Sequence, residues 1–424
     1  MFVNAWRRVV DPTQGSPVAD NLRLLAGAEN IIAGRAPPSS LGVSAPRDDI
    51  LVVTLARPAP YFPELLTHAS TFPVYSELAA KSHDPKTWVS NGAYVLNRWI
   101  PGGTIQLSKN PAYWDRGHVA ISRVEYIPLP DANAELLRYR AGQLDVTQSV
   151  PPAALDSIRK ERPNELHVAP FLGTVYYAFN LHSAPFKDNA NLRKALVMAV
   201  GRREILSTIE PFDQNPAYGF VPKGTWNYEP QSWAWANWSD AARLAEARRL
   251  YAAAGYSKAI PLHLKLLHNA NPNIKQLAVA VASMWRESLG IETDLIDEEY
   301  RVFLDSRKDV SRWDIVRLAW TADYNDAGNF LDTFHTNSPN NDSGFHNARF
   351  DELLEEAAKN ADPMKRREAL ESAEQIMLAD YPVIPIYFLS SKRLIKPNIH
   401  GELPNPLNRL YSKHLSIDVG RPTQ

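Results

Sequence analysis

Apolar residues recur along the chain with two different periods, and together these predict a mixture of strands and helices. Residues 50–55 and 174–179 are runs of apolar, β-branched and aromatic residues, which favours strands. Residues 239–254 and 274–289 instead repeat apolar positions every three or four residues, and each run stops at a glycine. The chain is therefore predicted to belong to the α/β class.

From residue 262 onward the two patterns alternate. Strands are predicted at 262–267, 291–296, 313–320 and 383–388, and helices at 274–289, 299–307, 349–360 and 363–380. Strand–helix–strand order is typical of parallel strands joined by helical crossovers, so we expect a mostly parallel sheet covered by helices.

The first half of the chain is less regular. Helices are predicted at 3–10, 19–33, 132–141 and 191–205, and strands at 91–96, 104–107, 122–128 and 144–146, with a proline-rich and aromatic loop at 211–238. The first helix begins at Val3 without a capping residue, and no signal peptide precedes it. We expect the natural N-terminus and the export signal to lie further upstream.

The composition narrows the classes of function. Basic and acidic residues nearly balance, 46 against 47. The most basic stretch, residues 243–249, alternates with Ala, Glu and Leu as on a solvated helix face, so no nucleic-acid partner is expected. The absence of cysteine excludes disulfides, zinc–thiolate sites and thiol nucleophiles. No apolar run reaches the about 20 residues of a membrane span.

Familiar catalytic motifs are missing from the chain, including G-x-S-x-G, the Walker A loop, G-x-G-x-x-G and H-E-x-x-H. Residues 323–328 resemble a calcium loop, but Ala327 and Phe334 stand where oxygen ligands belong. His335 and His346 are interpreted as surface histidines. We predict a binding protein with no cofactor or metal; a hydrolase that uses Asp or Glu remains an alternative.

The best candidate for ligand chemistry is residues 317–325, where a predicted strand runs into a loop that carries Trp320 and Asp323. Ligands of open α/β sheets sit beyond the carboxyl ends of the strands, and a carboxylate there can pair with a ligand ammonium. From the pattern alone, a capping or solvated role for Asp323 is the simpler interpretation.

A chain-wide resemblance changes that balance. The segment 317–325 resembles the signature of the extracellular solute-binding proteins that serve peptide/nickel ABC importers, in their peptide-binding branch. Further motifs match in the same order along the chain: WRRVVDP from Trp6, NGAY from Asn91, NPAYW from Asn110, RYRAG from Arg138, APF from Ala184, FLDSR from Phe303 and IPIYF from Ile384. Each motif is weak alone, and their shared order is the strong signal.

The resemblance implies a periplasmic-binding-protein-like fold (type II, cluster C) with several lobes and a hinged cleft, lacking an N-terminal portion. It implies three lobes: residues 1–75 as the remainder of a small lobe, residues 76–172 with 391–424 as a discontinuous first lobe, and residues 173–390 as the α/β lobe that closes on the ligand.

The family's ligand residues carry over one by one. The acid for the peptide α-ammonium falls on Asp323, the cleft arginines on Arg307 and Arg317, the cleft tryptophan on Trp320 and a cleft tyrosine on Tyr176. Tyr300 stands where relatives have tryptophan. The arginines could equally form scaffold ion pairs. The implied partners are short peptides and an ABC importer permease, and the implied protein is a periplasmic or cell-surface monomer.

Three departures from the family pattern affect specificity. A disulfide found in relatives falls on Gly173 and Thr321, a histidine near short peptides falls on Ile274, and a tyrosine falls on Val18. Alternatives left open are a murein peptide, a metal chelate or haem as ligand, and a ligand-sensing regulator with this fold.

Overall fold

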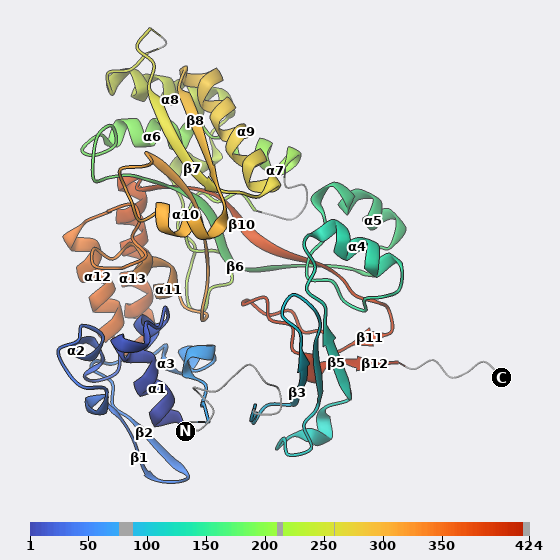
Figure 1. The fold of residues 1–424 in the computed structure, drawn as a ribbon. Helices are drawn as coiled ribbons and strands as arrows, with labels where there is room; N and C mark the ends of the chain where they lie inside the picture. The colour runs from blue at the N-terminus through green and yellow to red at the C-terminus, as the bar shows by residue number, and fades with distance from the viewer. Residues whose placement is uncertain (76–87, 210–214, 258, 419–424) are drawn as a thin grey trace. The chain divides into compact units, whose positions relative to one another are not determined.

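The computed structural model describes residues 1–75, 88–209, 215–257 and 259–418. The described residues fall into two compact units: those within Met1–Ala169 and Ser391–Gln424 form the first, and those within Pro170–Ser390 form the second (Figure 1). The chain passes from the first unit to the second within one long strand and returns within another. The finer division of the first unit at residue 75 remains a prediction.

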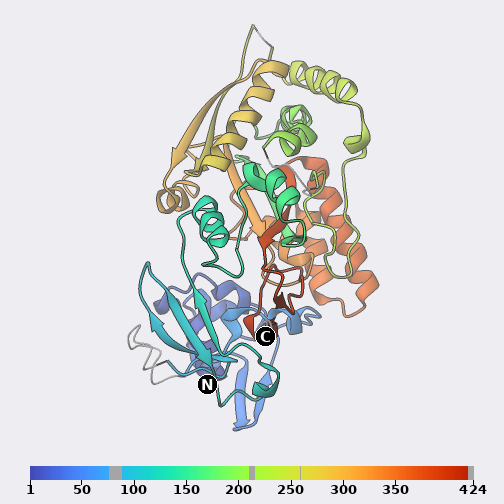
Figure 2. The ribbon, with the colours of Figure 1, turned by 90° about the vertical axis from the view of Figure 1, so that its right-hand side faces the viewer.

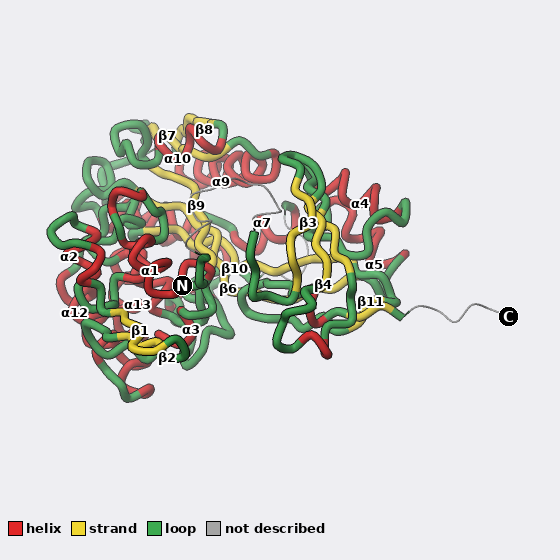
Figure 3. The backbone as a smooth tube through the Cα atoms, turned by 60° about the horizontal axis from the view of Figure 1, so that its bottom comes forward, coloured by secondary structure: helices red, strands yellow, loops and turns green. Residues whose placement is uncertain are grey.

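The first unit combines short helices with small antiparallel sheets. Its helices are α1 (Phe2–Val10), α2 (Ala28–Ile32), α3 (Phe62–Leu65), α4 (Ala132–Arg140) and α5 (Leu155–Glu161), and its strands are β1 (Val43–Arg47), β2 (Ile50–Val53), β3 (Tyr94–Trp99), β4 (Ile105–Lys109), β5 (Arg123–Tyr126), β11 (Ile399–His400) and β12 (Ser416–Ile417). Strands β1 and β2 form one pair and β11 and β12 another, while β3, β4 and β5 form a three-stranded sheet. Strands β3 and β4 run side by side in Figure 3.

Two predictions for this unit are wrong. The helix expected at 19–33 is instead a 3-10 turn followed by α2. The predicted helix is interrupted because Leu25 forms an isolated β-bridge with Leu55. In addition, Gly27 has a φ of 81°, which lies outside the right-handed helical region. The strand expected at 144–146 is reduced to a single bridge between Val146 and Ile395. Helix α1 is confirmed, and its Trp6 indole donates to the Thr71 carbonyl at 2.8 Å.

The second unit is built on a five-stranded sheet in the order β10-β6-β9-β7-β8. Its strands are β6 (Leu166–Phe179), β7 (His263–Asn269), β8 (Glu292–Glu298), β9 (Ile315–Thr321) and β10 (Val383–Leu394), and its helices are α6 (Ala190–Ala199), α7 (Arg202–Thr208), α8 (Asp240–Ala253), α9 (Pro272–Leu289), α10 (Tyr300–Ser306), α11 (Gly328–Leu331), α12 (Ala348–Lys359) and α13 (Pro363–Asp380). Helix α9 lies along β7 and β8, as Figures 1 and 2 show.

The expectation of a mostly parallel sheet holds for only part of it. Strand β7 is parallel to both β8 and β9, as the alternating pattern predicts. Strand β6, however, runs antiparallel to β9, with Tyr176 opposite Leu318. More than a hundred residues separate these two strands in sequence, so no local crossover pattern could reveal their relative direction. The fold is a mixed α/β fold.

Two further corrections involve buried arginines. The helix predicted at 191–205 is divided into α6 and α7, because Val200 is extended and Gly201 lies between them. Arg202 then turns inward, where its Nε donates to the carbonyls of Ala217 and Pro385. Arg243, predicted on a solvated face, is also buried and donates to the Val200 carbonyl at 3.2 Å. Both guanidinium groups are therefore buried and donate hydrogen bonds to backbone carbonyls.

Candidate functional site

The candidate site begins at the end of β9, a strand flanked by β6 and β7 in the middle of the sheet. Ile315, Val316 and Leu318 are buried, and the strand ends at the exposed Thr321. The loop that follows carries Asp323 and leads into α11. The pattern-based placement of Trp320 and Asp323 where a central strand becomes a loop is thus reproduced.

Asn329, at the second position of α11, joins these two residues. Its Oδ1 accepts the backbone N–H of Asp323 at 3.0 Å and the indole N–H of Trp320 at 3.2 Å. Trp320 and Asp323 are both partly buried, whereas Asn329 is 7% exposed. The loop therefore holds an acid and an aromatic ring through one shared acceptor. Sequence analysis missed Asn329, since an asparagine six residues after an acid has no recognisable pattern.

A buried ion pair anchors the same loop. Arg366 of α13 lies 2.5 Å from Asp326 Oδ1, and both side chains are 3% exposed. The same carboxylate oxygen accepts the N–H of Gly328 at 2.8 Å, at the start of α11. Asp326, considered above as part of a calcium-like loop, therefore balances a guanidinium. No group of three or more carboxylate or histidine side chains within the described residues is arranged to hold a metal ion.

A second buried acid, Asp342, lies close to the predicted Arg307, and its charge acts on the predicted Tyr176. Arg307 is 3.7 Å from Asp342 and Lys308 is 2.6 Å from it, so Arg307 takes part in an ion pair of the scaffold. Burial raises the pKa of Tyr176 above its ordinary value, and the Asp342 charge raises it further, whereas Arg307 and Arg317 oppose that rise. Within the described structure, the Nε atoms of both arginines are buried without a hydrogen-bond partner.

The β6–β9 register places the predicted residues on two faces of the sheet. Tyr176 pairs with Leu318 and Thr174 with Trp320, whereas Arg317 pairs with Tyr177. Because side chains alternate along a strand, Tyr176 and Trp320 share one face and Arg317 lies on the other. The sheet therefore does not bring all seven predicted residues together on one face.

Two predicted residues are exposed. Tyr300 opens α10, is 57% exposed and stacks on Phe303 with ring centroids 6.5 Å apart. Thr321 pairs directly with Gly173, and a Cβ built on Gly173 would lie 3.2 Å from the Thr321 methyl. These two positions are thus direct cross-strand neighbours, but this chain has no cysteine to join them.

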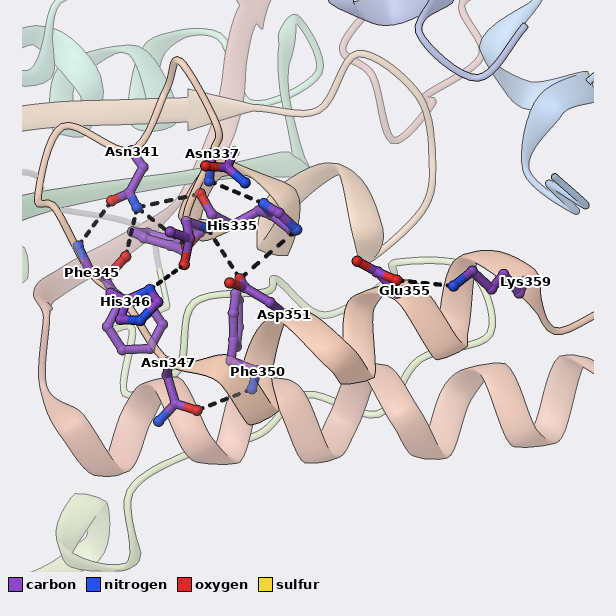
Figure 4. A network of polar contacts seen from close by, with 12 residues as sticks. His335, Asn337, Asn341, Phe345, His346, Asn347, Phe350, Asp351, Glu355 and Lys359 are labelled. Carbon is purple, nitrogen blue, oxygen red and sulfur yellow. Dashed lines mark hydrogen bonds and ion pairs between the residues drawn. The ribbon is translucent and has the colours of Figure 1, made fainter. Parts of the chain in front are cut away.

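His335 and His346 belong to a polar network at the start of α12 (Figure 4). Asp351 accepts the N–H of Thr336 at 3.1 Å and lies 4.0 Å from His335 Nε2. The Thr336 hydroxyl lies 2.8 Å from His346 Nδ1. These contacts fasten a turn to its helix, which is a structural role for both histidines.

Comparison with known proteins places these features in a family. Residues 1–342 match the family model described as bacterial extracellular solute-binding proteins, family 5 Middle. The chain is 38% identical to the periplasmic oligopeptide-binding protein of Salmonella typhimurium over 424 residues, covering 98% of this chain and 78% of that protein.

Two solved structures match nearly the whole length of this chain. The Escherichia coli murein tripeptide-binding protein has a TM-score of 0.89 at 33% identity, with 98% of this chain and 82% of that one covered. The Haemophilus influenzae oligopeptide-binding protein, solved in complex with the peptide RPPGFSPFR, has a TM-score of 0.86 at 35% identity, covering 98% and 83%. No described helix is long and apolar enough to cross a bilayer. The chain belongs to the family 5 bacterial extracellular solute-binding proteins, has their periplasmic-binding-protein fold, and is a binder and not an enzyme.

Proposed function

We propose that this chain binds short peptides and delivers them to the membrane permease of an ABC importer. The observation that carries the proposal is the loop after β9, where Asp323 and Trp320 are held together by Asn329 in a chain similar to a peptide-bound relative. A carboxylate at this position supplies the charge that a peptide α-ammonium needs, and an aromatic ring supplies an apolar wall.

The proposed site comprises Asp323 as the acid and Trp320 as the wall, with Tyr176, Tyr300, Thr321 and the two arginines as further contacts. Arg307 is proposed to meet the peptide's carbonyl or carboxylate groups, because its Nε–H has no hydrogen-bond partner within the described structure. Arg317, on the sheet face opposite Trp320, is proposed as a contact from the family resemblance alone. Closure of two lobes around the ligand stays a prediction. The periplasmic location of the relatives named above supports the same location here.

Asp323→Ala is expected to weaken the binding of a free tripeptide at least about tenfold, which corresponds to about 1.4 kcal/mol. The reason is that a charge-assisted hydrogen bond to the α-ammonium is lost. Isothermal titration calorimetry measures the change. The N-acetylated form of the same tripeptide should bind wild type and variant alike, because it carries no ammonium.

The matched control is Asp294→Ala, which removes an exposed carboxylate from β8 and should leave the affinity unchanged. Equal tripeptide affinities for wild type and Asp323→Ala would rule out the anchoring role. Equal affinities of the wild type for free and acetylated peptide would do the same.

A murein peptide is the second candidate ligand, supported by the TM-score of 0.89 with the murein tripeptide-binding protein. Such a peptide also offers a free amine, so the Asp323 variant cannot separate the two ligands. Competition calorimetry can: a murein tripeptide that displaces trialanine at equimolar concentration would favour the murein ligand, and the reverse order would favour ordinary peptides.

A further inference from the structure

The acceptor atom of Asn329 can be assigned from its partners. Both groups that face it, the Asp323 backbone N–H and the Trp320 indole N–H, are donors only. If the amide NH2 group occupied that place, its N–H donors would face two other N–H donors. Because Asn329 is only 7% exposed, this mismatch would be buried and therefore costly. The atom between them is therefore the carbonyl oxygen, and it links two residues of the proposed site.

Asn329 is itself held firmly in place. Its backbone N–H donates to the Asp326 carbonyl at 3.2 Å, and the Asp326 side chain is fixed by Arg366. The preceding Gly328 leaves no room for a side chain, because a Cβ there would lie 2.8 Å from Asp326 Oδ1. The amide oxygen therefore has little freedom to follow Asp323 or Trp320 if either moves.

We propose that Asn329 is a positioning residue for amino-end recognition, whose carbonyl oxygen sets the placement of Asp323 relative to the Trp320 ring. This inference rests on the proposed function, since it assumes that Asp323 meets the peptide ammonium. Asn329 acts through its two hydrogen bonds and does not contact the peptide. Its removal loosens the loop backbone at Asp323 and frees the indole to turn, so the acid is no longer presented beside the ring.

The first test uses Asn329→Ala with two readouts. The indole N–H resonance of Trp320, assigned by its loss in Trp320→Phe, should move in the nitrogen–proton correlation spectrum because its acceptor is gone. Calorimetry should show a free tripeptide bound about threefold to tenfold more weakly, the range expected for lost hydrogen bonds of this kind. The acetylated tripeptide should bind within about twofold of wild type, because it makes no use of the acid.

Asn329→Asp is the conservative variant, and it carries the test if the alanine variant fails to fold. A carboxylate accepts the same two N–H groups, so the Trp320 resonance and at least half of the free-tripeptide affinity should be retained. Asn347→Ala is the matched control: it removes the same side chain from the start of α12, where Oδ1 accepts the Phe350 N–H at 3.1 Å (Figure 4). That control should change neither readout.

The outcomes separate this inference from the proposed function. If Asp323→Ala weakens free-tripeptide binding but Asn329→Ala changes neither the resonance nor the affinity, the positioning role is wrong and peptide binding stands. An Asn329→Asp variant that loses the resonance position and the affinity together would also overturn it. If Asp323→Ala does not change the affinity for the free tripeptide, the proposed anchoring role of Asp323 is wrong, whatever the Asn329 variants show.

Discussion

Arg366→Met is expected to lower the unfolding free energy of the second unit by about 3–5 kcal/mol, the usual cost of breaking a buried ion pair from one side. The substitution keeps an apolar chain of similar length but removes the guanidinium that balances Asp326, 2.5 Å away with both side chains 3% exposed. It also removes a hydrogen bond from Arg366 to the Ala357 carbonyl at 2.8 Å. The Asp326 charge then remains in a nearly dry environment.

The measurement is urea unfolding followed by amide hydrogen exchange in α13 and residues 322–329, because a chain with two units need not unfold in one step. The midpoint for these amides should fall by about 1 M or more. In the double variant Arg366→Met with Asp326→Asn the uncharged amide keeps the acceptor for the Gly328 N–H, so at least half of the loss should be recovered.

Arg349→Met is the matched control for the ion pair. Arg349 also pairs with acids, Glu352 at 3.1 Å and Glu356 at 3.0 Å, but its side chain is 54% exposed. Water and salt already screen such a pair, so the midpoint should hardly move. Equal midpoints for the two methionine variants would show that the Arg366 pair is not a buried contact in solution.

The sequence predicts the regular elements well where one pattern continues without interruption. Helix α9 begins and ends within two residues of its prediction, since its apolar positions repeat until Gly290. The predicted helices at 19–33 and 191–205 are interrupted near Gly27 and Gly201, where the backbone makes contacts with distant parts of the chain, such as the bond from the Gly201 N–H to Met284 Sδ at 3.3 Å. The backbone of Leu25, for example, forms an isolated β-bridge with Leu55.

The candidate site is predictable only as far as its strand and its acid. Trp320 and Asp323 lie in one continuous motif, and the resemblance to a family gives them roles. Asn329, Asp326 and Arg366 could not be found in this way, because their importance depends on contacts made only in the folded loop. Forty residues separate the two members of the ion pair, and neither lies in a pattern that predicts burial.

Buried acids pose the same difficulty, and Glu374 of α13 is the clearest case. It is fully buried, and it accepts the backbone N–H groups of Phe220 at 2.6 Å and Val221 at 3.0 Å together with the hydroxyl of Tyr228. In sequence it is one of several acids within the helix predicted at 363–380, and no pattern marks it as buried. In the structure it fastens the loop before α8 to α13.

Glu374 is expected to make the second unit less stable as the pH rises from 4.5 to 7. Burial raises the pKa of this carboxyl from 4.5 to about 7, although the hydrogen bonds from Tyr228 and the backbone favour the ionised form. An acid with a raised folded-state pKa stabilises the fold fully below its unfolded value. That contribution is lost as the pH passes from the unfolded pKa to the folded one. The change amounts to about 3 kcal/mol.

The comparison of wild type with Glu374→Gln isolates this effect from the other titrating groups. Glutamine imitates the protonated acid, so the two proteins should be close in stability near pH 4.5, and the variant should gain about 3 kcal/mol relative to wild type by pH 7. Urea midpoints at half-unit pH steps, read from amide exchange around Phe220 and Val221, give the difference directly. A difference that stays constant across this interval would mean that Glu374 titrates at its ordinary pKa, and that the three donors around it outweigh the cost of burying its charge.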